Sequence, residues 1–313
     1  MVTMEKEEVH VLICDPIHES GVKILEESGF KVDVRPKIGY EELKNCVGGY
    51  DVLVVRSRTK VTREIIENGK RLKVVARAGA GIDNIDVDVA KERGVVVLNS
   101  PEALAVAVAE LTLGLILCLA RGIPRADRLM KEGKWAKKEF YGWQLRGKTL
   151  GVLGLGNIGS HVARLAKAFG MKILITKRTP PPPEVLEELQ AEFIPLNELL
   201  KRSYIVTIHV PLTPQTHHMI GEREIGLMKD GAYIVNTSRG AIVDEKALLE
   251  ALKSGKLAGA ALDVYEIEPP TNYELIKMPN VVCTPHIGAQ TVEAQEMAAK
   301  IIAEKIIKTI KGI

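Results

Sequence analysis

Three short segments in the second half of the sequence carry side chains that could do acid–base chemistry on a small organic acid. Each follows an apolar run typical of a buried strand: NTSRG supplies Arg239, DVYEIEPP supplies Glu268 and TPHIG supplies His286. A guanidinium fork can hold a carboxylate together with a neighbouring carbonyl oxygen. An imidazole can donate or accept a proton near neutral pH, and a carboxylate bonded to it favours the protonated ring. Each side chain alone has a structural explanation, but all three at strand ends indicate an active site.

A glycine-rich segment indicates where a dinucleotide binds. The sequence GVLGLGNIGS places Gly154, Gly156 and Gly159 in the spacing GxGxxG, after an apolar strand and at the start of a helix that runs to about Gly170. Such glycines allow a tight turn and let the backbone approach a pyrophosphate at the helix N-terminus. The spacing alone is weak evidence, but with a strand before it and a second strand at 172–176 it predicts a dinucleotide-binding unit.

The residues after that second strand bear on the choice of nicotinamide cofactor. NAD-binding units place an acid about 20 residues past the glycines, where it accepts hydrogen bonds from a ribose. This chain has Lys177, Arg178 and Thr179 instead. Basic groups and a hydroxyl can accommodate a 2′-phosphate, so they favour NADP(H) over NAD(H), with use of both cofactors left open. The alternative is that these side chains only face solvent.

Strands alternate with helices in two series, which is the pattern of parallel α/β sheets. Strands are predicted at 9–14, 31–34, 52–55, 73–76 and 95–98 in the first series, and at 149–153, 172–176, 193–194, 205–209, 232–236, 258–263 and 281–283 in the second. The last helix is predicted at 291–310. We therefore expect two doubly wound α/β domains: a substrate-binding domain from 1–100 and 287–313, and a dinucleotide-binding domain from 101–286 inserted into it. The active site is expected between them.

Two segments have unusual composition. The stretch 103–120 is apolar and long enough to raise the question of a membrane span. Glu110 near its middle, and the lack of a second such stretch, favour a helix buried between domains or subunits. The proline tract 180–183 is expected to be a stiff loop, because proline disfavours helix interiors and central strands.

The composition argues against several classes of partner. The 313 residues include 43 Lys and Arg against 40 Asp and Glu, and this net charge of +3 is too balanced to suggest nucleic acid or a membrane surface. The four cysteines form no CxxC pair, so we expect reduced thiols and no metal site: Cys14, Cys46, Cys118 and Cys283. The start of the chain, 1–8, is charged and lacks a signal-peptide pattern, which predicts a cytoplasmic protein.

Eight segments together give the chain a resemblance to a known family. They are VVRSRTKVT, VVARAGAGIDNID, AELTLGLILCLAR, GVLGLGNIGS, HVPLT, NTSRGAIVDE, ALDVYEIEPP and TPHIGAQT. Over nearly its whole length the chain resembles the D-isomer-specific 2-hydroxyacid dehydrogenases, and within them the phosphoglycerate dehydrogenases. The resemblance implies a Rossmann cofactor domain inserted in a flavodoxin-like substrate domain, a homodimer, and Arg239, Glu268 and His286 as the catalytic residues.

The resemblance, with the strand-end argument, also indicates which residues contact cofactor and substrate. The expected cofactor contacts are Gly154, Gly156, Asn157, Ile158, Gly159, Lys177, Arg178, Thr179, Val210, Pro211, Thr237, Ser238, Asp263, Gly288 and Ala289. Contacts to the substrate carboxylate are expected from Arg77, Ala78 and Gly79, and a contact to a substrate phosphate from Arg56.

The expected reaction is hydride transfer between NAD(P)(H) and a D-2-hydroxy acid or its 2-keto acid. The positive side chains of Arg56, Arg58, Lys60 and Arg77 favour a phosphorylated substrate, 3-phosphoglycerate or 3-phosphohydroxypyruvate, and so a role in serine biosynthesis. A glyoxylate or hydroxypyruvate reductase, which needs no phosphate contact, is the alternative. A nucleotide-sensing, co-repressor-like binding protein is the alternative of another class, disfavoured because all three catalytic residues are present.

Two departures from the phosphoglycerate dehydrogenases bear on substrate and regulation. Where those enzymes often have a Gly-Asn-Ser run before the apolar helix, this chain has Glu102-Ala103-Leu104-Ala105, which removes polar donors near the substrate. The sequence also ends at Ile313, so we expect a short form without the C-terminal regulatory domain that some members append.

Overall fold

The structure of the protein is a computed structural model, and it describes residues 8–313. The chain forms two compact units: unit 1 contains the residues up to Leu104 together with Gln290–Ile313, and unit 2 contains Ala105–Ala289. The sequence placed these boundaries after residues 100 and 286. Residues 1–7, on which most of the localisation prediction rests, lie outside the described residues.

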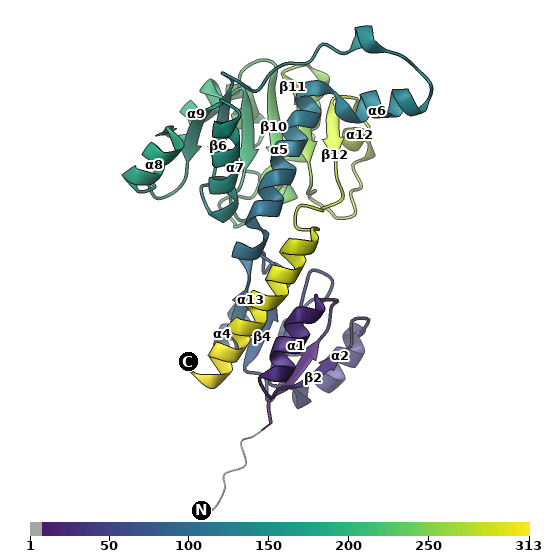
Figure 1. Cartoon of the computed structure of the whole chain (residues 1–313), viewed down its shortest axis with the longest axis vertical. Helices are drawn as coiled ribbons and strands as arrows, with labels where there is room; N and C mark the ends of the chain where they lie inside the picture. The colour runs from purple at the N-terminus through teal and green to yellow at the C-terminus, as the bar shows by residue number, and fades with distance from the viewer. Residues whose placement is uncertain (1–7) are drawn as a thin grey trace, which may run out of the picture. The chain divides into compact units, whose positions relative to one another are not determined.

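Unit 1 is built on a five-stranded parallel sheet with the order β2-β1-β3-β4-β5, of which β2 and β4 are labelled in Figure 1. Its strands are β1 His10–Ile13, β2 Lys31–Val34, β3 Val52–Val55, β4 Val74–Arg77 and β5 Val96–Asn99. Its helices are α1 Glu19–Glu27, α2 Tyr40–Cys46, α3 Arg63–Asn68, α4 Val87–Glu92 and α13 Val292–Lys311, with 3-10 turns at Val47–Gly49 and Pro101–Leu104. This strand order is that of flavodoxin-like folds.

Helices cover both faces of the sheet in unit 1. Val11 of β1 packs in one core with Leu25 of α1 and Ile302 of α13, which bury one face. Leu12, the next residue along β1, packs with the residues of α2, α3 and α4 that bury the other face. Successive strand residues point to opposite faces, so a strand buried on both sides must be apolar throughout. This explains why runs such as Val52–Val55 are continuous rather than alternating.

Unit 2 is built on a seven-stranded parallel sheet with the order β12-β11-β10-β9-β6-β7-β8 (Figure 1). Its strands are β6 Thr149–Leu153, β7 Lys172–Thr176, β8 Ala191–Phe193, β9 Ile205–Ile208, β10 Ala232–Asn236, β11 Leu257–Leu262 and β12 Val281–Cys283. Its helices are α5 Ala105–Arg121, α6 Ile123–Lys131, α7 Asn157–Ala168, α8 Pro183–Leu189, α9 Leu196–Arg202, α10 Glu222–Leu227, α11 Glu245–Lys253 and α12 Tyr273–Ile276, with 3-10 turns at Lys137–Glu139 and Gly240–Ile242. The residues of α5, α7 and α8 form one core with the sheet, and those of α9 to α12 form the other.

The apolar helix α5 belongs to the core of unit 2. Among the described residues, Pro101–Arg121 is the one helical segment long and apolar enough to cross a membrane by length and composition, with a mean hydropathy of 2.4. Of the 18 residues in it that give this hydropathy, 56% are buried. Ala109 and Ile116 of α5 are fully buried and lie in one core with Val162 of α7, while Glu110 faces solvent. Such packing is typical of a core helix.

The proline tract 180–183 was predicted to be a loop, and this prediction is wrong for its last residue, which is helical. Pro183 is the first residue of α8, and Pro182 is its N-cap. Proline is tolerated at this position because the N–H that it lacks would have no partner in the first turn, and its fixed φ suits a helix.

All strands within each sheet are parallel, so their carboxyl ends lie along one edge. In unit 2 the direction of winding reverses between β6 and β9, since β7 and β8 lie on one side of this pair and β10, β11 and β12 lie on the other. Ligands of open α/β sheets bind at the carboxyl edge beside such a switch point. Arg239, Asp263 and His286 follow β10, β11 and β12, so they all lie along this edge.

Candidate active site

The turn after β6 is tight, and it leaves the start of α7 open. Gly154 has a φ of +96°, and a Cβ at that position would lie 2.7 Å from the carbonyl oxygen of His209. A Cβ at Gly159 would lie 2.1 Å from the oxygen of Gly154, so neither position accepts a side chain. By contrast, no atom lies within 4 Å of a Cβ built on Gly156, and both Gly156 and Asn157 are exposed. This open space fits the approach of a pyrophosphate to the N-terminus of α7.

The basic cluster follows β7, the strand next to the glycine turn. The N–H of Gly154 donates to the carbonyl oxygen of Thr176 at 2.9 Å, which ties the ends of β6 and β7 together. Lys177 is half-buried, whereas Arg178 and Thr179 are exposed. In the part of the chain that the structure describes, no ion pair engages Lys177 or Arg178. Two positive charges therefore stand beside the glycine turn without a counter-charge.

The loops after β9 and β10 are tied to each other and to α5. The hydroxyl of Ser238 donates to the carbonyl oxygen of Val210 at 2.5 Å. The hydroxyl of Thr237 is buried and lies 2.8 Å from the hydroxyl of Thr112 in α5. Both predicted cofactor residues therefore use their hydroxyl groups within unit 2, where they hold the loop that carries Arg239.

Arg239 lies in a loop that packs closely on the loop after β11. A Cβ at Gly240 would lie 1.8 Å from the carbonyl carbon of Tyr265, so only glycine permits this approach. The guanidinium of Arg239 donates to the carbonyl oxygen of Ser238 at 2.8 Å through Nη1. Its positive charge also lowers the pKa of Glu268. The Arg-Gly sequence thus brings a cation next to the loop that bears Glu268.

His286 and Glu268 form a hydrogen-bonded pair. Nδ1 of His286 lies 2.7 Å from Oε2 of Glu268, and Oε1 of Glu268 accepts the N–H of Tyr265 at 3.2 Å. Burial alone would raise the pKa of Glu268, but the hydrogen bond and charge of His286, the Tyr265 N–H and the charge of Arg239 together hold that pKa below its usual value. An ionised carboxylate can only accept, so Nδ1 of His286 carries the proton of this bond and Nε2 is left for another partner. The imidazole is 47% exposed.

The loop that carries His286 is held by Asp263. His286 has a φ of 52°, in the left-handed region that residues other than glycine seldom adopt, and such strain persists only where other bonds maintain it. Asp263 is 1% exposed, and its carboxylate accepts the hydroxyl of Thr284 at 2.6 Å and the N–H groups of Ile287 and Gly288, both at 2.9 Å. These bonds bracket His286. The sequence predicted a cofactor contact for Asp263 and missed this role, for which its place directly after a buried strand was the only signal.

The remaining predicted cofactor residues lie at the same edge of the sheet. Ile158 is in the first turn of α7, Pro211 follows the end of β9, and Ala289 ends the His286 loop. Their contacts with a cofactor stay predictions. Within residues 8–313, no three His, Cys, Asp or Glu side chains are grouped so that they could hold a metal ion.

The predicted substrate residues lie at the carboxyl edge of the sheet in unit 1. Arg77 is the last residue of β4 and Arg56 follows β3, and both are half-buried. The N–H of Ala78 donates to the last residue of β3 at 3.0 Å, and the N–H of Gly79 donates to the hydroxyl of Ser100 at 3.1 Å. A substrate carboxylate that used these two N–H groups would have to replace those bonds.

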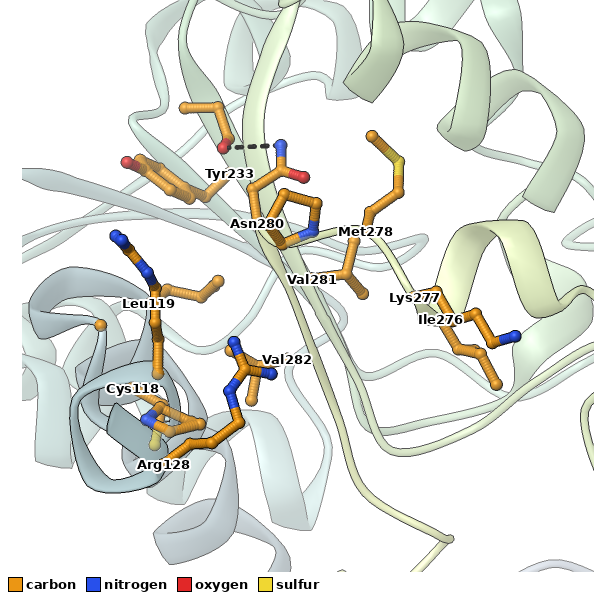
Figure 2. Close-up of a pocket in the computed structure, with 15 residues that line it drawn as sticks. Cys118, Leu119, Arg128, Tyr233, Ile276, Lys277, Met278, Asn280, Val281 and Val282 are labelled. Atoms are coloured by element: carbon orange, nitrogen blue, oxygen red, sulfur yellow. Dashed lines mark hydrogen bonds between the residues drawn. The ribbon is translucent and has the colours of Figure 1, made fainter. Parts of the chain in front are cut away.

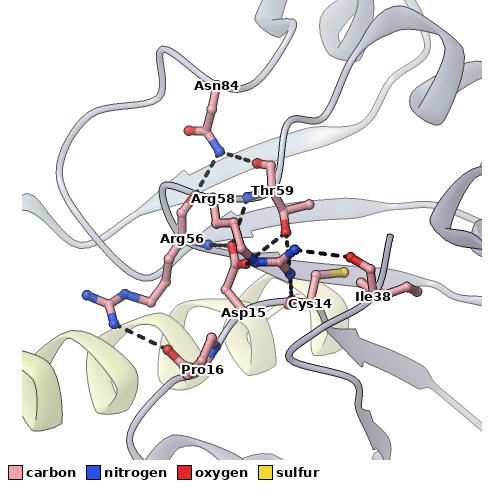
Figure 3. A network of polar contacts seen from close by, with 8 residues as sticks. All are labelled: Cys14, Asp15, Pro16, Ile38, Arg56, Arg58, Thr59 and Asn84. Atoms are coloured by element: carbon pink, nitrogen blue, oxygen red, sulfur yellow. Dashed lines mark hydrogen bonds and ion pairs between the residues drawn. The ribbon is translucent and has the colours of Figure 1, made fainter. Parts of the chain in front are cut away.

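The guanidinium of Arg58 is bonded within the protein, and its contribution of positive charge toward a substrate stays a prediction. Its guanidinium donates to the carboxylate of Asp15 at 2.9 Å and to the carbonyl oxygens of Cys14 at 2.5 Å and Ile38 at 3.1 Å (Figure 3). Arg56 differs from it, because its guanidinium makes one bond of 3.3 Å, to the carbonyl oxygen of Pro16. Of the two arginines, Arg56 is the one with donors to spare.

A cavity of about 520 Å³ lies at the opposite edge of the sheet in unit 2 (Figure 2). It is lined by the end of α5, by Arg128 of α6, by the segment 276–282 and by the starts of β10, β11 and β12. Its size suits a small molecule. None of the predicted site residues lines it, so it is separate from the strand ends that carry Arg239 and His286.

Comparison with known proteins identifies the family. Residues 113–288 match the family model described as D-isomer specific 2-hydroxyacid dehydrogenase, NAD binding domain. The chain belongs to this family. The predicted family and fold class are confirmed: in this D-2-hydroxyacid dehydrogenase, unit 2 is a Rossmann domain for a nicotinamide dinucleotide, inserted in the flavodoxin-like unit 1.

Proteins similar to this D-2-hydroxyacid dehydrogenase carry several names. It is 52% identical over 305 residues to D-3-phosphoglycerate dehydrogenase of Methanocaldococcus jannaschii, which covers 97% of the chain and 58% of that protein. It is 48% identical over 310 residues to hydroxypyruvate reductase of Thermotoga maritima, which covers 98% of the chain and 99% of that protein. The crystal structure of a glyoxylate reductase from Paecilomyes thermophila matches with a TM-score of 0.90 at 34% identity, over 97% of this chain and 96% of that one. The chain thus spans little more than half of the phosphoglycerate dehydrogenase that it matches.

Proposed function

We propose that this protein transfers a hydride between NAD(P)(H) and a D-2-hydroxy acid or its 2-keto acid, with Arg239, Glu268 and His286 as catalytic residues. The observation that carries the proposal is the 2.7 Å bond between His286 and Glu268. These residues lie in two loops that follow neighbouring strands, along the same edge of the sheet as the glycine turn. The nicotinamide would supply or accept the hydride. The chain itself must bind the acid and move one proton.

The chain's own residues account for the proton and for the charge of the substrate. In reduction, Nε2 of His286 would donate its proton to the oxygen that becomes the hydroxyl, while Glu268 stabilises the imidazolium through Nδ1. Arg239 would hold the carboxylate of the acid and polarise its keto group. In oxidation the neutral ring of His286 would accept the hydroxyl proton instead.

For the substrate we propose 3-phosphohydroxypyruvate and 3-phosphoglycerate, and hence a role in serine biosynthesis. Arg56 supports this choice, because it lies at the carboxyl edge of unit 1 and its guanidinium retains donors beyond its bond to Pro16. Burial lowers the pKa of Arg56, with the charge of Asp15 opposing, yet an arginine stays charged, and a partly desolvated guanidinium pairs strongly with a phosphate. The 52% identity to a phosphoglycerate dehydrogenase points the same way.

A hydroxypyruvate or glyoxylate reductase is the second candidate. The match to a hydroxypyruvate reductase extends over 99% of that protein. In addition, Glu102 stands where phosphoglycerate dehydrogenases often have small polar residues, and its carboxylate pairs with Lys305 of α13 at 2.7 Å. That position therefore offers no free polar donor to a phosphorylated substrate.

A panel of 2-keto acids with NADH and NADPH separates these candidates. We expect phosphohydroxypyruvate to be reduced with a kcat/KM roughly 10- to 150-fold above that of hydroxypyruvate. This ratio corresponds to one charge-assisted hydrogen bond, which contributes about 1.5 to 3 kcal/mol. Arg56→Ala should remove this preference. Arg63→Ala is the matched control, because Arg63 is an exposed arginine on α3 of the same unit. Equal efficiency toward both acids would support the reductase, and no turnover of any acid would support a binding protein.

We further propose that the protein is a cytoplasmic homodimer that uses the arm 122–143. No residue of α6 is buried, and the arm exposes Met130 by 54%, Trp135 by 79% and Tyr141 by 92%. Exposed apolar patches of this kind mark interaction surfaces. Sedimentation equilibrium should find a dimer for the wild type and a shift toward monomer for Trp135→Glu. Tyr273→Glu, at a residue that is 61% exposed outside the arm, should leave the mass unchanged. A monomeric wild type would contradict the proposal.

A further inference from the structure

A network of polar side chains occupies the switch point of the sheet in unit 1. In the order β2-β1-β3-β4-β5 the direction of winding reverses between β1 and β3. Asp15 follows β1 and Arg56 follows β3, so both lie at the carboxyl edge beside that point (Figure 3). This is where flavodoxin-like sheets bind their ligands.

Asp15 holds one side of the loop that follows β3. Its carboxylate is 1% exposed and accepts four hydrogen bonds, all from the loop 56–59. Two come from backbone N–H groups, that of Arg56 at 2.6 Å and that of Thr59 at 3.2 Å. The other two come from the hydroxyl of Thr59 at 2.8 Å and the guanidinium of Arg58 at 2.9 Å. A buried carboxylate needs such compensation, so the loop and Asp15 fix each other.

Asn84 holds the other side of the same loop. Its side-chain amide donates to the carbonyl oxygens of Arg56 at 2.8 Å and Thr59 at 2.6 Å (Figure 3). The position of Asn84 is itself fixed by backbone bonds. Its main-chain carbonyl oxygen accepts the N–H of Val61 at 2.8 Å, and the N–H of Asp86 donates to the main-chain carbonyl oxygen of Val61 at 2.9 Å. Both the N–H and the carbonyl of Arg56 are therefore bonded to side chains that lie far away in the sequence.

We infer that Asp15 and Asn84 are positioning residues that set where the guanidinium of Arg56 stands, and so determine the preference for a phosphorylated acid. The inference rests on the proposed function of Arg56. The two arginines of the loop differ in how they use their donors. The guanidinium of Arg58 donates to Asp15, Cys14 and Ile38. The backbone of Arg56 is fixed, whereas its side chain makes one long bond, to Pro16. A side chain that leaves a rigid backbone loses less freedom when it binds an anion.

The experiment compares Asn84→Ala and Asp15→Asn with matched controls. Asn68→Ala removes another amide that donates to a backbone oxygen, at 2.7 Å on Glu64 in α3. Asp51→Asn neutralises another aspartate that is 1% exposed and pairs with Arg71 and Lys73, directly before β3 rather than after it. The ratio of kcat/KM for phosphohydroxypyruvate to that for hydroxypyruvate should fall roughly 5- to 30-fold in the two test variants, mainly through KM of the phosphorylated acid. It should stay near the wild-type value in the two controls, and affinity for the cofactor should not change.

Amide hydrogen exchange gives a second readout that does not depend on the substrate. In Asp15→Asn the N–H groups of Arg56 and Thr59, which donate to that carboxylate, should exchange at least about tenfold faster than in Asp51→Asn. Unchanged exchange, or fast exchange with an unchanged ratio of kcat/KM, would overturn the inference. If the wild type shows no preference for the phosphorylated acid, the proposed substrate fails instead. The positioning role then requires that KM of the best acid rises in both Arg56→Ala and Asn84→Ala. If KM rises in neither variant, the positioning role is wrong.

Discussion

Nδ1 of His286 lies 2.7 Å from Oε2 of Glu268, and the second oxygen of that carboxylate is held by the N–H of Tyr265. The carboxylate is therefore fixed on one side by the backbone and fixes the imidazole on the other. Since one ring nitrogen is occupied, only Nε2 of His286 can exchange a proton with a substrate. The carboxylate thus sets the orientation of the ring of the proposed proton donor.

Replacing Glu268 by glutamine should change the pH dependence of reduction. The carboxylate of Glu268 has a pKa held below its usual value, so it is ionised throughout the neutral range and favours a protonated neighbour. Without that charge the imidazolium form of the proton donor loses a stabilising neighbour, so the pH above which reduction slows should move downward and the rate near neutrality should fall. A pH profile of kcat/KM for the wild type and Glu268→Gln measures this.

Glu266→Gln is the control for that profile. Glu266 lies two residues away and also pairs with a histidine, since its Oε1 is 3.0 Å from Nε2 of His218. Its replacement should leave the profile in place. An unmoved profile in Glu268→Gln would show that another group sets the charge of His286.

Removing the imidazole should abolish most turnover while sparing cofactor affinity. General acid–base catalysis contributes roughly 100- to 10,000-fold, and His286→Ala removes it without touching the glycine turn after β6. Single-turnover kinetics with the best keto acid would give the chemical rate, and fluorescence titration would give the Kd of the reduced cofactor. His218→Ala is the control. Retention of more than about a tenth of the wild-type rate would exclude His286 as the proton donor.

Neutralising Asp263 should release the loop that carries His286. The Asp263→Asn side chain keeps its shape but loses the charge that accepts the hydroxyl of Thr284 and two N–H groups. We expect kcat to fall at least about tenfold and hydrogen exchange at Ile287 and Gly288 to accelerate, because charged acceptors contribute about 1.5 to 3 kcal/mol. A variant with slower turnover but unchanged exchange would point to a direct role toward cofactor or substrate.

His209 should make the protein less stable as the pH falls. Burial lowers the pKa of His209 to about 3, and its Nε2 lies 2.8 Å from the hydroxyl of Thr207. Above pH ~6.5 the ring is neutral in the folded and unfolded states alike. Below that value only the unfolded chain takes up the proton, so His209 should cost about 1.4 kcal/mol of unfolding free energy per pH unit until the pH nears 3.

Urea denaturation between about pH 5 and pH 6.5 tests this slope. The unfolding free energy of His209→Asn should depend less on pH than that of the wild type over this window. His217→Asn, at an exposed residue of the same loop, should keep the wild-type slope. Equal slopes in all three proteins would mean that His209 titrates in the folded state as it does in the unfolded chain.

The sequence predicted the sheets well because parallel strands buried on both faces are continuous apolar runs. Six strands have in the structure the bounds that the sequence predicted: Lys31–Val34, Val52–Val55, Thr149–Leu153, Lys172–Thr176, Ala232–Asn236 and Val281–Cys283. The order of residues along the chain also placed Arg239 and His286 at one edge, since parallel strands share the direction of their carboxyl ends. The bond between His286 and Glu268 was expected because an imidazole that transfers protons is stabilised by a neighbouring carboxylate, and no spacing in the sequence indicated it.

What the sequence could not predict are the hydrogen bonds that cross between loops. Asp263 contacts Gly288 and Asp15 contacts Arg58, and nothing in the local pattern tells which way a buried aspartate points. The same limit applies to Arg58, because its ion pair with Asp15 could not be read from the sequence. Pro183 was misjudged because proline is excluded from helix interiors but favoured in the first turn.

The last prediction concerns Lys177, Arg178 and Thr179 after β7. NAD-binding units usually place an acid here, which accepts hydrogen bonds from the ribose and repels a 2′-phosphate. Lys177 is half-buried beside the glycine turn, and no ion pair engages it in the described part of the chain. We therefore propose that the enzyme prefers NADPH, and that Lys177→Asp moves the ratio of kcat/KM for NADPH over NADH toward NADH by at least about tenfold, or about 1.4 kcal/mol. Lys172→Asp reverses a charge at the opposite end of the same strand, so it should leave the ratio unchanged. A wild type that prefers NADH, with a ratio that neither variant moves, would show that the side chain of Lys177 never reaches the ribose.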